Sequence, residues 1–438
     1  MSERPFRAPR AILVGMGETA GYCGQLAAGF RAIGLRADHL DLGPDPLSYG
    51  SRHGPAHVRL VRWLEQRRRR RSGLRPAWTL LHRAAMVVLL LHALVTYDAF
   101  VLRAGDSFLG LRDLPLLRRL GKRVVVVFFG SDSRPSYLNG AEVARGIEGD
   151  RAATETAAKR RLVERIEASA TAIVCHTMSA HLHRRPVVAF LEIGIPRPSP
   201  RDALGGPSRP EGRTVRVLHA PSRSVDKGTE LVRAAVERAR VAGANVELEV
   251  ITGRPNHEVL DAIATCDFVI DQVFADTPMG GFAAEAAALG RPAIVGGYGW
   301  QELQDAMGSE AVPPSHVCVP EALSEAIVEL ASDEAYRREL GERARHYVAE
   351  RWAPAAVARR FVTLFGGDVP EHWWFDPAEV VYAYGVGMSQ QAVSASIRRV
   401  LETNGPAGLG AGDKPELERR LIELASRGIQ ADATVASS

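Results

Sequence analysis

Residues 276–297 (DTPMGGFAAEAAALGRPAIVGG) constrain the fold of this chain more than any other segment. A loop with the glycine pair Gly280 and Gly281 leads into a helix-forming run at 282–289, and an apolar run follows at 293–295. Gly290 stops the helix, and the proline two positions later prevents its continuation. The segment therefore predicts a loop, a helix, a tight turn and a buried strand, which together make one repeat of an α/β domain.

The start of this helix has the chemistry of an anion site. Its first turn carries backbone N–H groups without helical partners, and the helix dipole adds positive potential, so a phosphate is favoured there. Glu285 is the one acid in the helix and lies one turn in. One interpretation is that its carboxylate accepts two hydroxyls of a ribose. The other is that this good helix former simply faces water.

Length and composition set the class of protein. A chain of 438 residues is long enough for two or three domains, and 46% apolar with 24% charged residues is ordinary for a globular protein. The four cysteines are scattered and form neither a metal-ligand spacing nor a disulfide framework, so a reducing cytoplasm is expected. The first ten residues show no secretory signal pattern, which favours the same location.

The net charge of +4 hides a strong local asymmetry. Residues 52–83 contain ten arginines, including the run at 67–71, and a single acid, Glu65. This segment therefore carries +9, which leaves −5 for the rest of the chain. The basicity belongs to one patch and not to the whole surface.

An uncharged run of twelve residues at 84–95 follows this patch. Crossing a bilayer needs about 20 apolar residues, so the run predicts a buried helix of the N-terminal domain. Two interpretations of the neighbouring arginines stay open: a solvated basic face, and a helix that lies on an anionic membrane surface. Nucleic acid is disfavoured as a partner, because neither aromatic interleaving nor a nucleic-acid motif is present.

The N-terminal half opens as a doubly wound α/β domain. An apolar strand at 11–14 is followed by a glycine-rich loop, a helix at 25–33 and a second strand at 37–42. The glycines are spaced G-x-G-x-x-x-G, which departs from the dinucleotide pattern and leaves a dehydrogenase as a minor alternative. The loop can also receive a substrate, so Gly17 and Gly21 are candidate acceptor-side residues.

The run at 123–129 (RVVVVFF) predicts a central parallel strand buried on both faces. Ligands of open α/β sheets bind beyond the carboxyl ends of the strands. The residues that follow this strand are therefore candidates for the mouth of a cleft: Gly130, Ser131, Asp132 and Arg134. The alternative for Asp132 is a structural turn that its own carboxylate caps.

A proline-, glycine- and serine-rich stretch divides the chain, and a second strand–helix alternation follows it. We therefore expect two Rossmann-like α/β domains that face a cleft, an N-terminal one at 1–195 and a C-terminal one at 213–365. Residues 196–212 are the predicted linker. Residues 366–438 are predicted to form a helical C-terminal extension with a frayed tail.

The second domain gathers groups that suit a nucleoside diphosphate. Ser222, Arg223 and Lys227 lie on the loop after its first strand. Arginine stabilises phosphate through a planar fork and lysine as a point charge. With Glu285 for the ribose and the glycine pair for backbone donors, these residues predict a pyrophosphate site. A sugar attached to that diphosphate would point toward Asp132 and the Gly17 loop.

Three segments of the second half carry a family resemblance: HAPSRSVDKGT, CDFVIDQ and GGFAAEAAALGRPAIV. They resemble the C-terminal domain of GT-B glycosyltransferases of the retaining group-1, family 4-like type. GSDSR after the buried strand of the first half is similar to a bacterial subset of these enzymes. The resemblance implies that Arg223 and Lys227 bind the donor diphosphate and Glu285 its ribose. It also implies that a helix at 355–365 crosses back to the N-terminal domain.

The resemblance has one departure. The wider family carries a second glutamate eight positions before the ribose acid, beside the donor sugar, and this position is Thr277 here. Three explanations stay open: neighbouring Asp276 substitutes, backbone amides hold the sugar, or the sugar contact is lost. Thr277, Ser222, Gly280 and Gly281 complete the predicted donor-binding set.

The predicted activity is transfer of a sugar from a nucleotide-diphosphate sugar to an acceptor. The favoured outcome is retention of the configuration at the anomeric carbon. If the outcome is inversion, Asp132 is the candidate base. Arg223 and Lys227 would stabilise the leaving diphosphate. The sequence contains no D-x-D motif, so neither a metal nor a cofactor is expected. The favoured location is the cytoplasm. If the basic patch binds lipid, the protein would be peripheral at the inner face of the membrane. That position would suit a lipid-linked or anionic acceptor.

Two alternatives remain. The first is a pseudo-glycosyltransferase or epimerase with the same fold. The second is a non-enzymatic protein that uses the arginine patch to bind a membrane.

Overall fold

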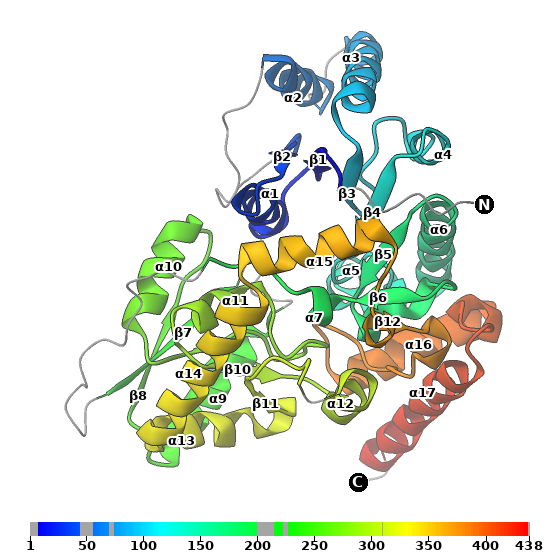
Figure 1. Ribbon diagram of the computed structural model, residues 1–438. Coiled ribbons are helices and arrows are strands. Elements are labelled where there is room, and N and C mark those ends of the chain that lie inside the picture. The colour runs from blue at the N-terminus through cyan, green and yellow to red at the C-terminus, as the bar shows by residue number, and fades with distance from the viewer. Residues whose placement is uncertain are drawn as a thin grey trace.

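The computed structural model describes residues 8–43, 56–69, 74–198, 214–221, 227–308 and 310–436, with the side chains of 56–57 and 427–436 excepted. These residues form two mainly parallel sheets with helices around them (Figure 1). The first sheet has strand order β12-β6-β5-β4-β3-β1-β2, and the second has β11-β10-β9-β7-β8. We call each sheet with its helices a lobe. The two predicted α/β halves are confirmed.

The first sheet is parallel except at one edge, where β12 pairs antiparallel with β6. Its central strands β1 and β5 are buried along their whole length and β4 is buried after Arg123, because helices cover both faces of a parallel sheet. The strands are β1 (Ala11–Val14), β2 (Arg36–His39), β3 (Ala99–Arg103), β4 (Arg123–Val127), β5 (Ala172–Cys175), β6 (Val187–Ala189) and β12 (Trp374–Phe375). The helices of this half are α1 (Tyr22–Ala32), α2 (Ala56–Arg69), α3 (Arg75–Thr96), α4 (Asp113–Arg119), α5 (Gly140–Val143), α6 (Gly149–Glu167) and α7 (Phe190–Ile193).

The second sheet is parallel throughout its described strands. Its strands are β7 (Val215–His219), β8 (Val246–Val250), β9 (Phe268–Ile270), β10 (Ala293–Gly296) and β11 (His316–Cys318). Its helices are α9 (Thr229–Val241), α10 (Asn256–Thr265), α11 (Gly281–Ala288), α12 (Trp300–Met307), α13 (Leu323–Ser332) and α14 (Glu334–Arg351). The helix and strand expected at 282–289 and 293–295 are confirmed as α11 and β10.

After α14 the chain returns to the first lobe, as the resemblance implied. Helix α15 (Pro354–Gly366) packs against α1, where Phe30 contacts Phe361 and Phe365. Gly29 of α1 lies so close to the backbone of Pro354 that no side chain fits there. Helices α16 (Gln390–Asn404) and α17 (Pro415–Ala436) follow, and α16 packs on α6 of the first lobe (Figure 1).

Trp374 and Phe375, in the predicted C-terminal extension, form the edge strand β12. One expectation about a single segment is wrong. The apolar run at 84–95 was expected to be a buried helix, yet it belongs to the 22-residue helix α3, of which only one face is buried. By length and composition α3 could cross a membrane. The predicted linker lies outside the described residues from position 199 on.

Candidate functional site

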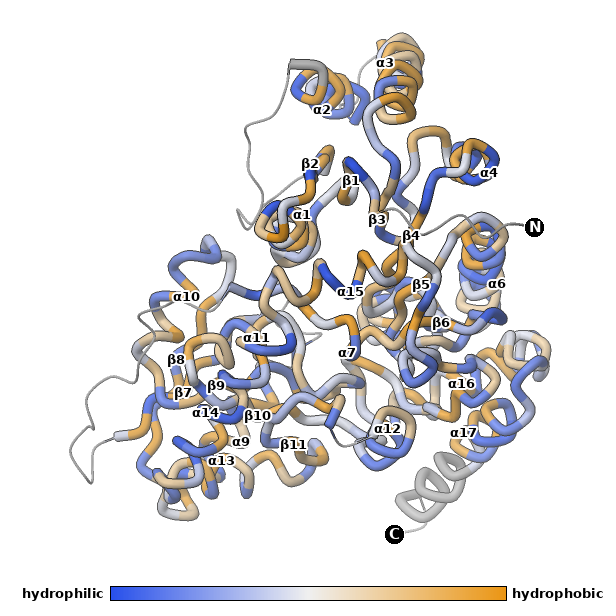
Figure 2. The backbone as a smooth tube through the Cα atoms, in the orientation of Figure 1, coloured by the Kyte–Doolittle hydropathy of each residue, from blue (hydrophilic) through white to orange (hydrophobic). Residues whose placement is uncertain are grey.

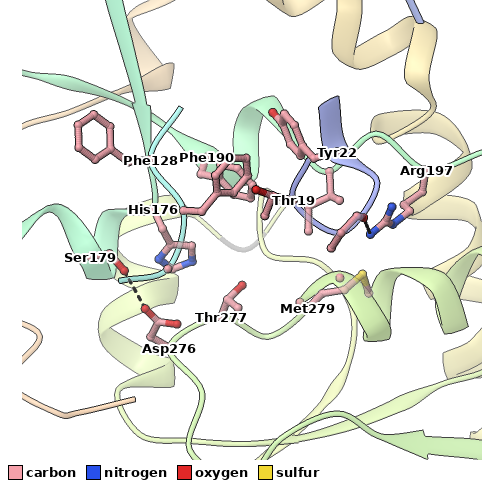
Figure 3. A pocket seen from close by; sticks show the side chains of 16 residues that line it. Thr19, Tyr22, Phe128, His176, Ser179, Phe190, Arg197, Asp276, Thr277 and Met279 are labelled. Atoms are coloured by element: carbon pink, nitrogen blue, oxygen red, sulfur yellow. Dashed lines mark hydrogen bonds between the residues drawn. The ribbon is translucent and has the colours of Figure 1, made fainter. Parts of the chain in front are cut away.

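A cavity lies between the two lobes, with about 690 Å³ of space between atoms, part of it open to solvent. The first lobe supplies residues that follow β1, β4 and β5, and the second supplies the loop before α11 (Figure 3). The cavity is lined by Thr19, Ala20, Tyr22, Phe128, Phe129, Gly130, His176, Ser179, Phe190, Ile195, Arg197, Asp276, Thr277, Met279, Gly280 and Gly281.

The amino end of α11 opens into this cavity. Gly280 is its N-cap residue, and Gly281 is its first residue. A side chain at Gly280 would meet the carboxylate of Asp271 at 2.8 Å, and one at Gly281 would meet the guanidinium of Arg197 at 3.3 Å. The glycine pair therefore lets buried charged groups approach the backbone that faces the cavity. Thr277 lines the same wall, so the structure brings three predicted donor-side residues together.

Glu285 lies one turn behind this helix start and is buried, with 6% of its surface exposed. The interpretation that it faces water is therefore wrong. Its Oε1 accepts a hydrogen bond from Asn256 Nδ2 at 3.1 Å and lies 3.7 Å from Arg197 Nη2. Asn256 is the first residue of α10, and Arg197 comes from the segment that leads out of the first lobe.

Lys227 lies at the same edge of the second sheet. Its Nζ donates to Gln272 Oε1 at 2.7 Å and to Asp271 Oδ1 at 3.3 Å. Since the Asp271 carboxylate also packs on Gly280, the ammonium of Lys227 and the start of α11 lie on either side of one acid. Ser222 and Arg223, the other predicted diphosphate ligands, lie outside the described residues.

The glycine-rich loop after β1 is filled by the protein's own side chains. The carboxylate of Glu18 accepts the backbone N–H groups of Thr19, Cys23 and Gly24 at 2.7–3.0 Å, so an internal anion already occupies the start of α1. The guanidinium of Arg103 lies against Gly17 and donates to Glu18 O at 3.1 Å. This arrangement argues against the dinucleotide alternative, because no room is left for a pyrophosphate. Gly17 does not line the cavity.

Gly21 is the N-cap residue of α1, with φ of 78°, a conformation that favours glycine. It lies between the cavity-lining residues Ala20 and Tyr22. Tyr22 packs on Phe129 and Phe190, with ring centroids 5.0 and 5.9 Å apart, so the first-lobe wall of the cavity is largely aromatic.

Asp132 follows β4 but does not line the cavity. Its Oδ2 accepts the backbone N–H of Phe129 at 2.9 Å, so the carboxylate caps its own turn. Burial raises the pKa of Asp132, and this hydrogen bond with the charges of Arg103 and Lys159 offsets only part of the rise. Of its neighbours, Gly130 lines the cavity, whereas Ser131 is exposed and does not.

Arg134 reaches across the lobes. Its Nη2 pairs with Asp276 Oδ2 and also donates to Ser179 Oγ at 2.7 Å, while Ser179 Oγ donates to the same Asp276 oxygen at 2.8 Å. Burial alone would raise the pKa of Asp276, but Arg134 and the Ser179 hydroxyl outweigh it and hold this pKa below its usual value. Asp276 is thus a paired, ionised acid in the wall of the cavity.

His176 is a cavity residue that sequence reasoning did not single out, although it directly follows β5. Its Nδ1 accepts the backbone N–H of Met178 at 3.2 Å, and burial lowers its pKa. The ring is therefore neutral with its proton on Nε2, which makes Nε2 a donor. Within the described part of the chain this buried Nε2 has no partner. The buried Tyr22 hydroxyl is likewise without a partner there.

Among the described residues no group of three His, Cys, Asp or Glu side chains could hold a metal ion. Metal independence stays a prediction, because part of the chain lies outside the description.

No family model matches the sequence, and no curated protein matches it. Solved structures that resemble the fold include HepE of Anabaena in complex with UDP, with 12% identity and a TM-score of 0.48 over 80% of this chain and 98% of HepE. The glycosyltransferase SnogD of Streptomyces nogalater shares 15% identity, with a TM-score of 0.39 over 81% and 99% of the two chains. TarM of S. aureus shares 10%, with a TM-score of 0.41 over 65% of this chain and 59% of TarM. The two parallel sheets, the cavity between them and the return of α15 agree with the expected fold of two Rossmann-like domains that face a cleft.

Proposed function

We propose that this chain is a metal-independent glycosyltransferase that moves a sugar from a nucleoside-diphosphate sugar to an acceptor. One observation carries the proposal: the amino end of α11 opens into the interlobe cavity while Glu285 is buried one turn behind it beside Asn256. A helix start favours phosphate, and the resemblance implies that Glu285 binds the pentose.

The donor would lie along the edge of the second lobe. Its diphosphate would contact the backbone of Gly280 and Gly281 and the ammonium of Lys227, with Arg223 as a further cation from outside the described residues. Its ribose would contact Glu285. The sugar would then occupy the cavity, with Gly130 and the Nε2 proton of His176 on the first-lobe side. Fixed donors at the diphosphate stabilise the charge that develops as it leaves.

Transfer breaks the bond between the anomeric carbon and the diphosphate oxygen and forms a bond from that carbon to the acceptor oxygen. In the retaining route that we favour, the acceptor proton passes to the departing phosphate oxygen, so no dedicated base is needed. In an inverting route the proton would pass to a carboxylate. Asp132 is the predicted base for that route, but its carboxylate caps its own turn and does not line the cavity, which counts against inversion.

Nucleotide binding tests the proposal directly. UDP, GDP and TDP are each added to the full chain, and both the melting temperature and the heat of binding are measured. We expect at least one of them to raise the melting temperature, and Lys227→Ala to weaken its binding at least tenfold with the fold intact. Arg238→Ala, an exposed cation on α9, is the matched control and should bind as the wild type. The absence of binding by all three nucleotides would overturn the proposal.

A second candidate keeps the fold and the nucleotide but not the sugar transfer. Thr277 stands where a sugar-binding acid is expected, and the adjacent Asp276 is paired with Arg134. These two facts favour a pseudo-glycosyltransferase or an epimerase. Incubation with UDP-, GDP- and TDP-sugars separates the candidates: nucleotide binding without transfer or hydrolysis of any donor supports the second, and release of nucleoside diphosphate supports the first.

A further inference from the structure

Helix α3 exposes a continuous apolar stripe. With about 3.6 residues per turn, the residues of the stripe fall on one side of the helix: Leu80 (70% exposed), Leu81 (50%), Val88 (64%), Leu91 (58%) and Val95 (90%). The stripe is about 22 Å long at 1.5 Å per residue. The opposite face is buried in the core of the first lobe through Met86, Leu89, Leu90 and Ala93. Isolated exposed apolar residues are ordinary, but an ordered row of five is not.

Helix α2 lies beside α3 and adds aromatic residues (Figures 1 and 2). Trp63 of α2 contacts Trp78 of α3 edge to face at 5.5 Å, and the guanidinium of Arg67 lies 5.1 and 6.0 Å from the two rings. Trp63 and Leu60 are 42% and 52% exposed. Tryptophan with an arginine over its ring is typical of groups that lie at the boundary between acyl chains and lipid headgroups.

The charge of this surface is positive. Arg67, Arg69, Arg75 and Arg83 are all exposed. The single acid of the segment, Glu65, is turned inward, with 12% of its side chain exposed and Arg68, Arg69 and His82 as ion-pair partners. Basic side chains that border an apolar stripe are complementary to anionic headgroups above an acyl layer.

We propose that α2 and the stripe of α3 form a docking surface for an anionic lipid bilayer, on which the helices lie flat. A spanning orientation is disfavoured, because the buried face of α3 belongs to the core of the first lobe and Arg75 and Arg83 lie on the same helix. This surface is separate from the interlobe cavity, so the inference does not depend on the proposed sugar transfer.

Vesicle flotation with the full chain tests this inference. Vesicles of phosphatidylglycerol and phosphatidylcholine are compared with vesicles of phosphatidylcholine alone, at low and high salt. We expect at least tenfold more protein on the anionic vesicles and a loss of binding at high salt. The variant Leu81→Ser/Val88→Ser/Leu91→Ser should bind the anionic vesicles at least tenfold less than the wild type. Leu231→Ser/Val241→Ser, a change to exposed apolar residues of the second lobe, should bind as the wild type.

Three outcomes count against the surface. Equal binding to neutral and anionic vesicles would show that the positive charge of the surface does not determine binding. Unchanged flotation of the α3 variant would show that the apolar stripe does not contact the vesicle. Dimerisation of the wild type without vesicles, lost in the α3 variant, would assign the stripe to a second copy of the chain. Nucleotide-induced stabilisation of the α3 variant is measured in parallel. It should equal that of the wild type, which shows that the variant is folded and separates this result from failure of the proposed function.

Discussion

Arg134 of the first lobe and Asp276 of the second form an ion pair across the interlobe cavity, and Ser179 donates to the same carboxylate oxygen. Both charged side chains are buried, with 2% and 7% of their surface exposed. The pair joins residues 142 positions apart in the chain. It fixes the two walls relative to each other and keeps Asp276 ionised.

Removing one partner should destabilise the protein strongly. Arg134→Met or Asp276→Asn leaves the other group buried without its partner, which costs about 3–5 kcal/mol of unfolding free energy. The double variant Arg134→Met/Asp276→Asn should lose less stability than the sum of the two single changes. Urea unfolding of the four proteins measures this. Additive losses would mean that the pair contributes nothing as a pair.

The neutral tautomer of His176 leads to a prediction about activity. Because its Nδ1 accepts from Met178, only the Nε2 proton is available to a ligand. His176→Phe should lower donor affinity or turnover by about 5–15-fold, the effect of losing one hydrogen bond of about 1–1.5 kcal/mol. His176→Gln, which retains an N–H donor, should recover part of it. The ring would instead be identified as a base if the wild-type rate decreased as the pH was lowered below 6.5 and the rate of His176→Gln did not.

The alternation of strands and helices could be predicted because strands buried on both faces read as apolar runs, as at β4 and β5, and because glycine and proline mark the ends of helices. The glycine pair before α11 predicted the cavity wall for a similar reason, since the backbone requirement is local. The burial of Glu285 was left open, because its partners Asn256 and Arg197 come from other segments.

What the sequence did not predict depends on contacts between distant segments. The pairing of Arg134 with Asp276 has no local signature. The strand β12 is two residues long and exists through its pairing with β6, so no periodic pattern could reveal it. Helix α3 was misread because its exposed face is also apolar, which removes the polar side by which an amphipathic helix is recognised.

The buried histidine His181 predicts an acid limit to stability. Its Nε2 lies 2.8 Å from the backbone oxygen of Tyr382, and burial lowers its pKa to about 4. The unfolded chain would take up this proton near pH 6.5, whereas the folded chain does so only near pH 4. Between these values the unfolded state binds more protons, so stability falls as the pH falls, by about 3.4 kcal/mol in all for this group.

Urea unfolding at pH 7.5, 6 and 5 measures this loss in the wild type and in His181→Gln. The variant should lose less stability over the same range, because it has no proton to gain at this position. Equal losses in the two proteins would show that other groups cause the acid sensitivity.

The position of Glu285 predicts discrimination between ribose and deoxyribose. If its carboxylate accepts both hydroxyls of the donor ribose, a 2′-deoxynucleoside diphosphate should bind about 10–100-fold more weakly than the ribonucleotide, the effect of one hydrogen bond to a charged group. Glu285→Gln should weaken the binding of the ribonucleotide more than that of the deoxyribonucleotide. The ratio of the two dissociation constants should then narrow to about threefold or less. Glu339→Gln, an exposed acid of α14, is the control and should keep the wild-type ratio. Titration calorimetry with the four combinations gives both ratios. A wild-type ratio near one would show that Glu285 serves Asn256 and Arg197 as a structural acid and that the pentose lies elsewhere.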